Sequence, residues 1–234
     1  RDVQSAFLAE IQAVEVEPIE PVYADFEKDM SIFNVKGVDV LYAQNKINDV
    51  TGITIEYNTG TESDPALNLA FDYLSYLGTP TRSAEEIAQQ MYQLACNFGL
   101  SSGSNRTFIS IYGLSDNMPE AMAIVEDLAY NAVPDEAILA NLKADMFKSR
   151  ADAKLNQGAC FGQLQQYVLY GPEFIKKTTL TDKQIQSITS EELLAKVREL
   201  LGCQHEIRYS GPASEKEVAK LIEENHIIAE NLKP

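Results

Sequence analysis

Apolar and polar residues alternate along two short segments in the first quarter of the chain. Residues 38–44 and 50–58 each place apolar side chains at every second position, as a strand with one buried face does. The residues that join them, 45–49, are rich in Asn and Asp, which favour turns. The pattern therefore predicts an antiparallel hairpin with one buried face.

Apolar residues at helical spacing follow the predicted hairpin. Asp64-Pro65 opens this helix and Gly78-Thr79-Pro80 ends it, and the apolar residues between them lie three or four positions apart. The same reasoning predicts helices over 83–97, from 117, from 135, and around Phe161, Leu164 and Val168 up to Gly171-Pro172. Capping boxes are expected at Ser83, Thr181, Thr189 and Ser214.

Three further segments have the character of strands, namely 99–105, 106–113 and 205–210. Strands, helices, strands and then helices with one returning strand follow one another along the chain. This order predicts the α+β class, with a mixed, mainly antiparallel sheet and helices packed on one face. The glycine-rich stretch 99–103 lacks the spacing and the lysine of a phosphate loop, so we interpret it as a bulged or edge strand.

The first 30 residues differ in composition from the rest. Residues 14–21 alternate acidic, proline and aliphatic residues, as interdomain linkers do. We therefore divide the chain of 234 residues into a linker or N-terminal extension, 1–30, and an α+β domain, 31–234. Because the chain also starts at Arg1 rather than Met, we interpret it as a piece of a longer protein.

The formal charge of −16 makes nucleic acid an unfavourable partner, since phosphates would be repelled. No apolar run approaches the ~20 residues that cross a bilayer, and no signal-peptide pattern opens the chain, so we expect a soluble protein without a membrane partner. Three widely spaced cysteines indicate neither a disulfide framework nor a zinc ribbon. Cytoplasm and periplasm both remain open.

Several strings in a fixed order resemble one enzyme family. They are YAQN at 42–45, AFDYLSYLGT at 70–79, GLSDN at 113–117, RADAKLN at 150–156, YGP at 170–172 and RYSGP at 208–212. Together they resemble the pitrilysin/insulinase family of zinc metallopeptidases, the inverted zincins, and most of all the first domain of the C-terminal half of long, four-domain members. The resemblance implies homologous α+β domains arranged as two halves around a chamber.

In that family an H-x-x-E-H helix holds the catalytic zinc, and its glutamate activates a water. Counting back from Gly78-Thr79, those positions hold Leu69, Asp72 and Tyr73 here, and neither Leu nor neutral Tyr replaces an imidazole on Zn²⁺. The third ligand would be a downstream Glu, yet residues 137–172 contain none. The resemblance thus implies a degenerate motif, with no catalytic, metal or cofactor site in this chain and Zn in the catalytic half of the full-length protein.

Two histidines also need an interpretation. Cys203 and His205, two residues apart at a strand edge, share one face and permit a metal contact or a Cys-His nucleophile pair, although a structural role is the simpler interpretation. His226 follows the last predicted helix and is placed to complement its dipole. The family also uses an Arg and a Tyr of its C-terminal half on substrate, normally from the following domain, and we do not assign that role here.

Our first hypothesis is a non-catalytic domain of a zinc-dependent endopeptidase or oligopeptidase that forms part of the peptide-enclosing chamber. Its partners would be the other domains of the same chain, especially the zinc-bearing half, and an unfolded peptide. The alternative is a wholly inactive relative that acts as a structural or assembly subunit. An unrelated α+β peptide-binding module is a third interpretation. Whether the full-length protein is an enzyme stays open.

Overall fold

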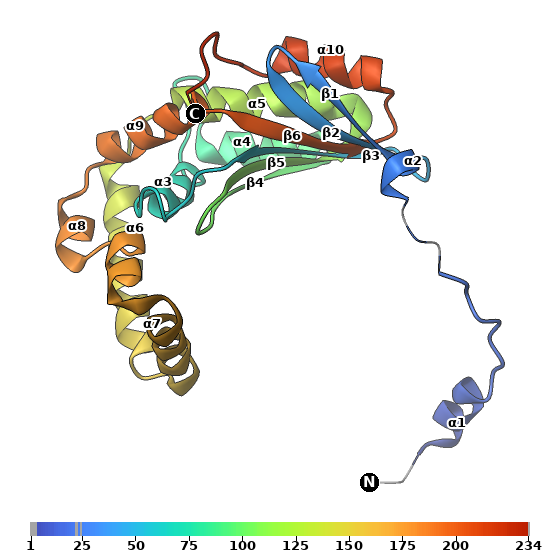
Figure 1. Cartoon of the computed structure of the whole chain (residues 1–234), viewed down its shortest axis with the longest axis horizontal. Helices are drawn as coiled ribbons and strands as arrows, with labels where there is room; N and C mark the ends of the chain where they lie inside the picture. The colour runs from blue at the N-terminus through green and yellow to red at the C-terminus, as the bar shows by residue number, and fades with distance from the viewer. Residues whose placement is uncertain (1–3, 22, 24, 234) are drawn as a thin grey trace.

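The structure, a computed structural model, describes residues 4–21, 23 and 25–233, and its centre is a six-stranded sheet (Figure 1). The strands are β1 (Met30–Val35), β2 (Val38–Gln44), β3 (Val50–Tyr57), β4 (Cys96–Ser102), β5 (Thr107–Leu114) and β6 (His205–Gly211). Their order across the sheet is β1-β2-β6-β3-β5-β4. Only β2 and β6 are parallel neighbours among these strands, which confirms the predicted mixed, mainly antiparallel sheet.

The predicted hairpin of residues 38–44 and 50–58 is wrong in its pairing, although both strands exist. β6 lies between β2 and β3, with Ile207 opposite Val40 on one side and opposite Ile55 on the other. Alternation identifies a strand with one buried face but not its neighbour, and β6 arrives from far along the chain. The edge strand β1 was not predicted, whereas β4, which contains the glycine-rich stretch 99–103, is an edge strand as expected.

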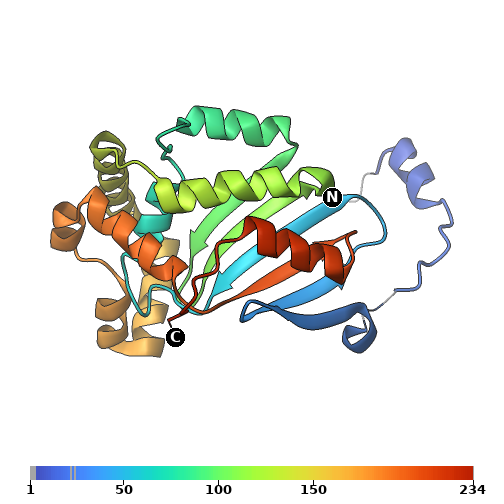
Figure 2. The ribbon, with the colours of Figure 1, turned by 90° about the horizontal axis from the view of Figure 1, so that it is seen from above.

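One face of the sheet is covered by helices, as predicted. Figure 2 shows α5 and α10 lying over the strands and α4 beside the edge strand β4, while α3 and α9 pack together at one end. The helices are α1 (Ala6–Gln12), α2 (Phe26–Asp29), α3 (Leu67–Leu74), α4 (Ala84–Gln93), α5 (Met118–Asn131), α6 (Glu136–Ala153), α7 (Gln157–Thr178), α8 (Asp182–Ser187), α9 (Ser190–Leu201) and α10 (Glu215–Asn225). A short 3₁₀ turn, η1 (Ser115–Asn117), precedes α5. Phe71, Tyr57 and Met122 are among the large side chains that fill the core.

Local sequence signals fix most helix starts. All four predicted capping boxes are present, at the N-termini of α4, α8, α9 and α10. The helix predicted over 83–97 ends earlier, at Gln93. Ala95 adopts a left-handed φ of 49°, and the chain enters β4 directly afterwards. Its C-terminal residues were therefore assigned to the wrong element.

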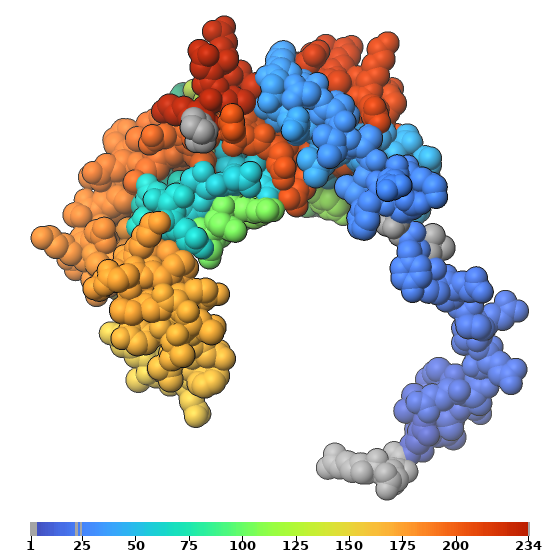
Figure 3. Space-filling model, viewed as in Figure 1, coloured from blue at the N-terminus to red at the C-terminus, as the bar shows by residue number. Residues whose placement is uncertain are grey.

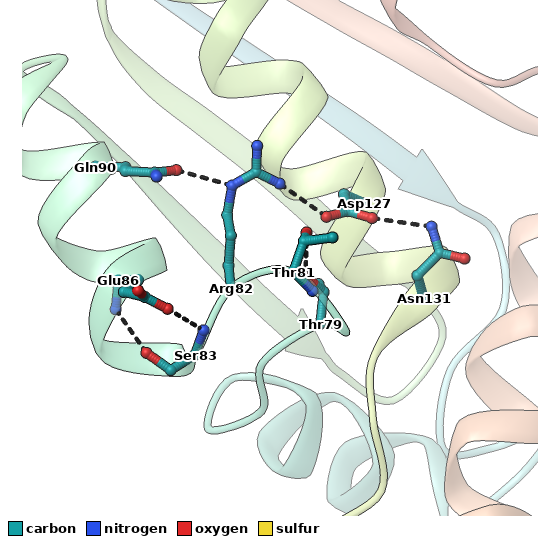
Figure 4. A network of polar contacts seen from close by, with 8 residues as sticks. All are labelled: Thr79, Thr81, Arg82, Ser83, Glu86, Gln90, Asp127 and Asn131. Carbon is teal, nitrogen blue, oxygen red and sulfur yellow. Dashed lines mark hydrogen bonds and ion pairs between the residues drawn. The ribbon is translucent and has the colours of Figure 1, made fainter.

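The connection between α3 and α4 is held by polar contacts to α5 (Figure 4). Arg82 donates from Nε to Gln90 Oε1 at 2.9 Å and from Nη1 to Asp127 Oδ2 at 2.9 Å. Asn131 donates to the other oxygen of Asp127, also at 2.9 Å. A Cβ at Gly78 would lie 2.5 Å from the carbonyl oxygen of Arg82, so only glycine fits this turn. These contacts hold the turn between α3 and α4 against α5.

Helices α6 and α7 form an arm that projects from the domain (Figures 1 and 3). The predicted interruption at Gly171-Pro172 is present, because Gly171 has a φ of 79°, but the helix resumes after it and ends at Thr178. All 22 residues of α7 are described, and none of them is buried. The arm and the sheet border an open hollow on the side away from α5 and α10 (Figure 3).

Helix α1 lies apart from the domain (Figure 1). In α1, Phe7 is 72% exposed and Ile11 is 52% exposed. The helix α2 leads into β1, so the sheet begins at Met30. The division at residue 30 stays a prediction. Among the described residues, the structure contains no helix with the length and hydrophobicity that a bilayer crossing requires.

Candidate functional site

Leu69 and Tyr73, which stand where the resemblance places zinc-binding histidines, lie on the buried face of α3. Their exposed fractions are 3% and 0%. The Tyr73 hydroxyl accepts a hydrogen bond from the backbone N–H of Asp135 at 2.7 Å and donates one to the carbonyl of Asp135 at 3.0 Å. Burial raises the pKa of this phenol above its usual value, so it stays neutral and ties α3 to the start of α6.

Asp72, in the position of the catalytic glutamate, lies on the exposed side of α3. Partial burial raises the pKa of its carboxyl. Within residues 4–21, 23 and 25–233, no three His, Cys, Asp or Glu side chains gather closely enough to hold a metal ion. Leu69, Asp72 and Tyr73 are thus brought together only as one turn of a helix. Their assignment as a degenerate motif stays a prediction.

On the open face of the sheet, two arginines cover a buried carboxylate. Glu56 in β3 is 0% exposed although it points away from the helices. Its Oε1 contacts Arg106 Nη1, and its Oε2 lies 2.5 Å from Arg208 Nη2. Each arginine side chain remains 45% exposed. Beyond these ion pairs the described residues offer the carboxylate no hydrogen-bond partner, so its charge depends on the two guanidinium groups.

The sheet register explains this arrangement. Glu56 lies directly opposite Glu206 of β6, and like charges in directly opposed positions destabilise a sheet. Arg208 sits two residues further along β6 and also contacts Glu206, at 3.2 Å. Arg106 approaches from the turn before β5. The two arginines therefore compensate two carboxylates on neighbouring strands.

On the same face, β3 and β5 carry neutral hydrogen-bonding groups, and β2 carries a further carboxylate, Asp39, opposite Glu206. Thr54 and Ser110 face each other with their hydroxyl oxygens 3.2 Å apart, and Tyr112, two residues beyond Ser110, is 58% exposed. This face borders the hollow beside the arm (Figure 3). Together with the free N–H groups of the arginines, it offers donors, acceptors and an aromatic ring to an extended peptide.

Cys203 and His205 do not form a nucleophile pair. The Cys203 thiol donates to the carbonyl of Glu199 at 3.5 Å, and burial raises its pKa above the usual value. His205 Nδ1 instead lies 2.9 Å from the backbone carbonyl of Cys203. A thiol with a raised pKa and no contact to an imidazole is a poor nucleophile at neutral pH. The structural interpretation of both residues is favoured.

His205 belongs to a buried chain of polar groups that sequence reasoning missed. Its Nε2 lies 3.0 Å from Nε2 of His226, whose Nδ1 lies 2.5 Å from Glu126 Oε1. His226 is the C-cap residue of α10, but the ring that was predicted to complement the dipole of this helix turns to Glu126 on α5 instead. Only the 21-residue spacing of the two histidines is visible in the sequence, and it signals no contact.

The hydrogen-bond pairing fixes where the protons lie. A carbonyl only accepts, so His205 carries its proton on Nδ1. Burial lowers the pKa of His205 to about 4, which keeps the ring neutral at pH 7 with an accepting Nε2. His226 therefore donates from its Nε2 to His205, and its Nδ1 contacts Glu126. This chain joins β6, α5 and the segment after α10.

We expect His205 to make the fold sensitive to acid. Its folded-state pKa of about 4 lies below the unfolded value of about 6.5, so between these values the unfolded state binds more protons. Stability should therefore fall as the pH drops from 6.5 towards 4, by roughly 3 kcal/mol. Urea unfolding of the wild type and of His205→Asn between pH 4 and pH 6.5 measures how the free energy of unfolding of each protein depends on pH. Because carboxylates titrate there too, parallel curves for the two proteins would contradict the prediction.

Comparison with known proteins places this fold among peptidases. No family model matches the chain. It is 23% identical over 150 residues to an uncharacterised zinc protease of Rickettsia felis, a stretch that covers 64% of this chain and 36% of that protein. The predicted resemblance to zinc metallopeptidases is thus supported in sequence.

Solved structures show the same similarity in fold. A peptidase M16 inactive domain from Pseudomonas fluorescens matches with a TM-score of 0.74 and 18% identity, over 88% of this chain and 52% of that one. The periplasmic protease PqqL from Escherichia coli matches with a TM-score of 0.72 and 15% identity, over 95% of this chain and 27% of that one. The ferredoxin protease FusC, in complex with Arabidopsis ferredoxin, matches with a TM-score of 0.71 and 11% identity, over 94% of this chain and 26% of that one.

The predicted resemblance to the pitrilysin/insulinase family is confirmed, because the chain has the fold of an M16, pitrilysin-type peptidase domain. It spans about a third of the curated relative and between a quarter and a half of the matched structures.

Proposed function

We propose that this chain is a non-catalytic domain of a zinc-dependent endopeptidase or oligopeptidase and forms part of the wall of a chamber that encloses an unfolded peptide. The observation that supports the proposal most is the character of α3. Where H-x-x-E-H would stand, Leu69 and Tyr73 are buried, and the Tyr73 hydroxyl is occupied by Asp135. Side chains that pack in the core leave no position for a tetrahedral Zn²⁺ site.

The open sheet face supports the part of the proposal that concerns the chamber. Arg106, Arg208 and Tyr112 are exposed on it, and the face borders the hollow (Figure 3). An enclosing wall contributes to catalysis by orienting the substrate and excluding bulk water, and it needs no catalytic group of its own. Zinc would be held elsewhere in the full-length protein.

The assembly-subunit alternative differs from the proposal in one respect. In the peptidase, another segment of the full-length protein carries an intact H-x-x-E-H, whereas in an assembly subunit every copy of the motif is degenerate. Zinc content separates the two, since tight Zn²⁺ binding requires the full ligand set.

The test is to measure zinc and peptidase activity in three preparations: the complete protein, the complete protein without this domain, and this chain alone. We expect one zinc per complete protein, an unchanged zinc content after deletion, and a loss of kcat/KM by about 10²-fold or more. This chain alone should bind no zinc. One-to-one zinc with activity in the chain alone would refute the non-catalytic assignment, and a complete protein without zinc would favour the assembly subunit.

A further inference from the structure

The arm formed by α6 and α7 exposes apolar side chains that nothing in the described chain covers. Phe161, Leu164 and Val168 are 60%, 56% and 72% exposed, and their spacing of three and four residues places them along one face of α7. Leu155, just before the helix, is 87% exposed. Residues 155–172 contain no charged side chain at all. A contiguous apolar surface of this kind marks an interaction site.

Helix α7 also lacks the packing that normally stabilises a helix in a protein. Most helical stability in proteins comes from packing an amphipathic face rather than from propensity. Yet all of α7 lies outside the core, and two glycines, Gly158 and Gly162, lower its propensity further. Packing against a surface beyond the described residues would supply the missing stabilisation.

The charge of the arm indicates what that surface contains. Residues 136–178 hold six Lys and Arg against four Asp and Glu, a net charge of +2, whereas the rest of the chain carries −18. Lys148, Lys154, Lys176 and Lys177 are exposed near the uncharged stretch, as are Asp152 and Glu173, the latter paired with Lys176. A complementary partner therefore combines an apolar centre with acidic residues around it.

We propose that the arm is the docking surface for another domain of the same protein, one that presents an apolar face bordered by acidic side chains. This inference rests on the proposed function and names its domain contact. The matched solved chains are about two to four times as long as the region they share with this one, which leaves length for such a domain. Tethering provides a millimolar effective concentration, whereas two free copies of charge −16 repel each other.

Hydrogen exchange in the complete protein and in this chain alone tests the proposal. The amides of α7 should exchange about 30-fold more slowly in the complete protein, a ratio that corresponds to about 2 kcal/mol of docking. The variant Leu164→Gln with Val168→Gln should abolish this protection. Because neither side chain is buried, the variant should keep the thermal midpoint of the chain alone. The matched control is Ile47→Gln, which removes a 92% exposed side chain from the turn between β2 and β3.

Four results would overturn the docking proposal. They are equal exchange of α7 in both proteins, protection by dimerisation of the chain alone in ultracentrifugation, protection only after an unfolded peptide such as reduced casein is added, and loss of protection in Ile47→Gln. Zinc content and peptidase activity test the proposed function independently of hydrogen exchange. If α7 is protected in a protein without peptidase activity, the docking site is retained and the proposed function is rejected. If the protein has peptidase activity but α7 is not protected, the proposed function is retained and the docking site is rejected.

Discussion

Replacing Arg106 and Arg208 together by glutamine is expected to cost the domain about 3 to 5 kcal/mol, because the carboxylate of Glu56 then stays buried without an opposite charge. Glu56 is 0% exposed and has both oxygens in contact with these two side chains. Either single variant leaves one guanidinium in place and should cost much less. Urea unfolding at pH 7 with a constant m-value measures the loss.

The matched control adds Glu56→Gln to the double variant. A neutral amide removes the uncompensated charge, so most of the lost stability should return, and the two sets of substitutions should be strongly non-additive. A double variant that loses less than about 1 kcal/mol, or one that Glu56→Gln fails to improve, would mean that solvent rather than the arginines stabilises the carboxylate.

The second large effect is expected on α3. Restoring the histidines of a zinc helix, by Leu69→His together with Tyr73→His, should destabilise the domain by roughly 4 kcal/mol or more. Leu69 is 3% exposed and Tyr73 is 0% exposed, so two imidazoles would replace packed side chains, and Asp135 would lose both of its hydrogen bonds to Tyr73. Thermal and urea unfolding with and without Zn²⁺ measure the loss and any rescue.

Tyr73→Phe is the matched control, since it keeps the ring and removes only the hydroxyl. It should cost about 1 to 3 kcal/mol, because the Asp135 N–H loses its acceptor, and Zn²⁺ should leave it unchanged. A metal that binds only the folded state adds about 2.7 kcal/mol at a hundred times its Kd. Such a gain in the double histidine variant would show that the geometry of a zinc site survives in α3.

Local elements were predictable from the sequence because their causes are local. Ser83 and Glu86 carry both halves of a capping box within four residues, and β2 and β3 show their buried faces by alternation. The pairing of these strands was not predictable in the same way. The strand that separates them, β6, begins at His205, and no short-range pattern reports which edge a distant strand will join.

In the candidate site, too, the features with local causes were predictable and those that depend on distant residues were not. Apolar residues at helical spacing predicted the helix that begins after Asp64-Pro65, and the structure buries Phe71, Leu74, Leu69 and Tyr73 in it. Alternation put Glu56 on the polar face of its strand, which is correct, but gave no sign of its burial. Arg106 and Arg208 cover it from residues 50 and 152 positions later. Contacts of that separation leave no periodic trace in a single sequence.

The central position of β6 also has a meaning for biosynthesis. A ribosome that adds about 5 to 20 residues per second needs roughly 7 to 30 s to pass from the end of β3, at Tyr57, to His205. Throughout that interval β2 and β3 have been synthesised but β6, the strand that pairs with both, has not. Their unpaired backbone groups can then pair with strands of other nascent chains. Chaperones that shield those two edges until β6 arrives would therefore determine how much of the protein reaches its folded state in the cell.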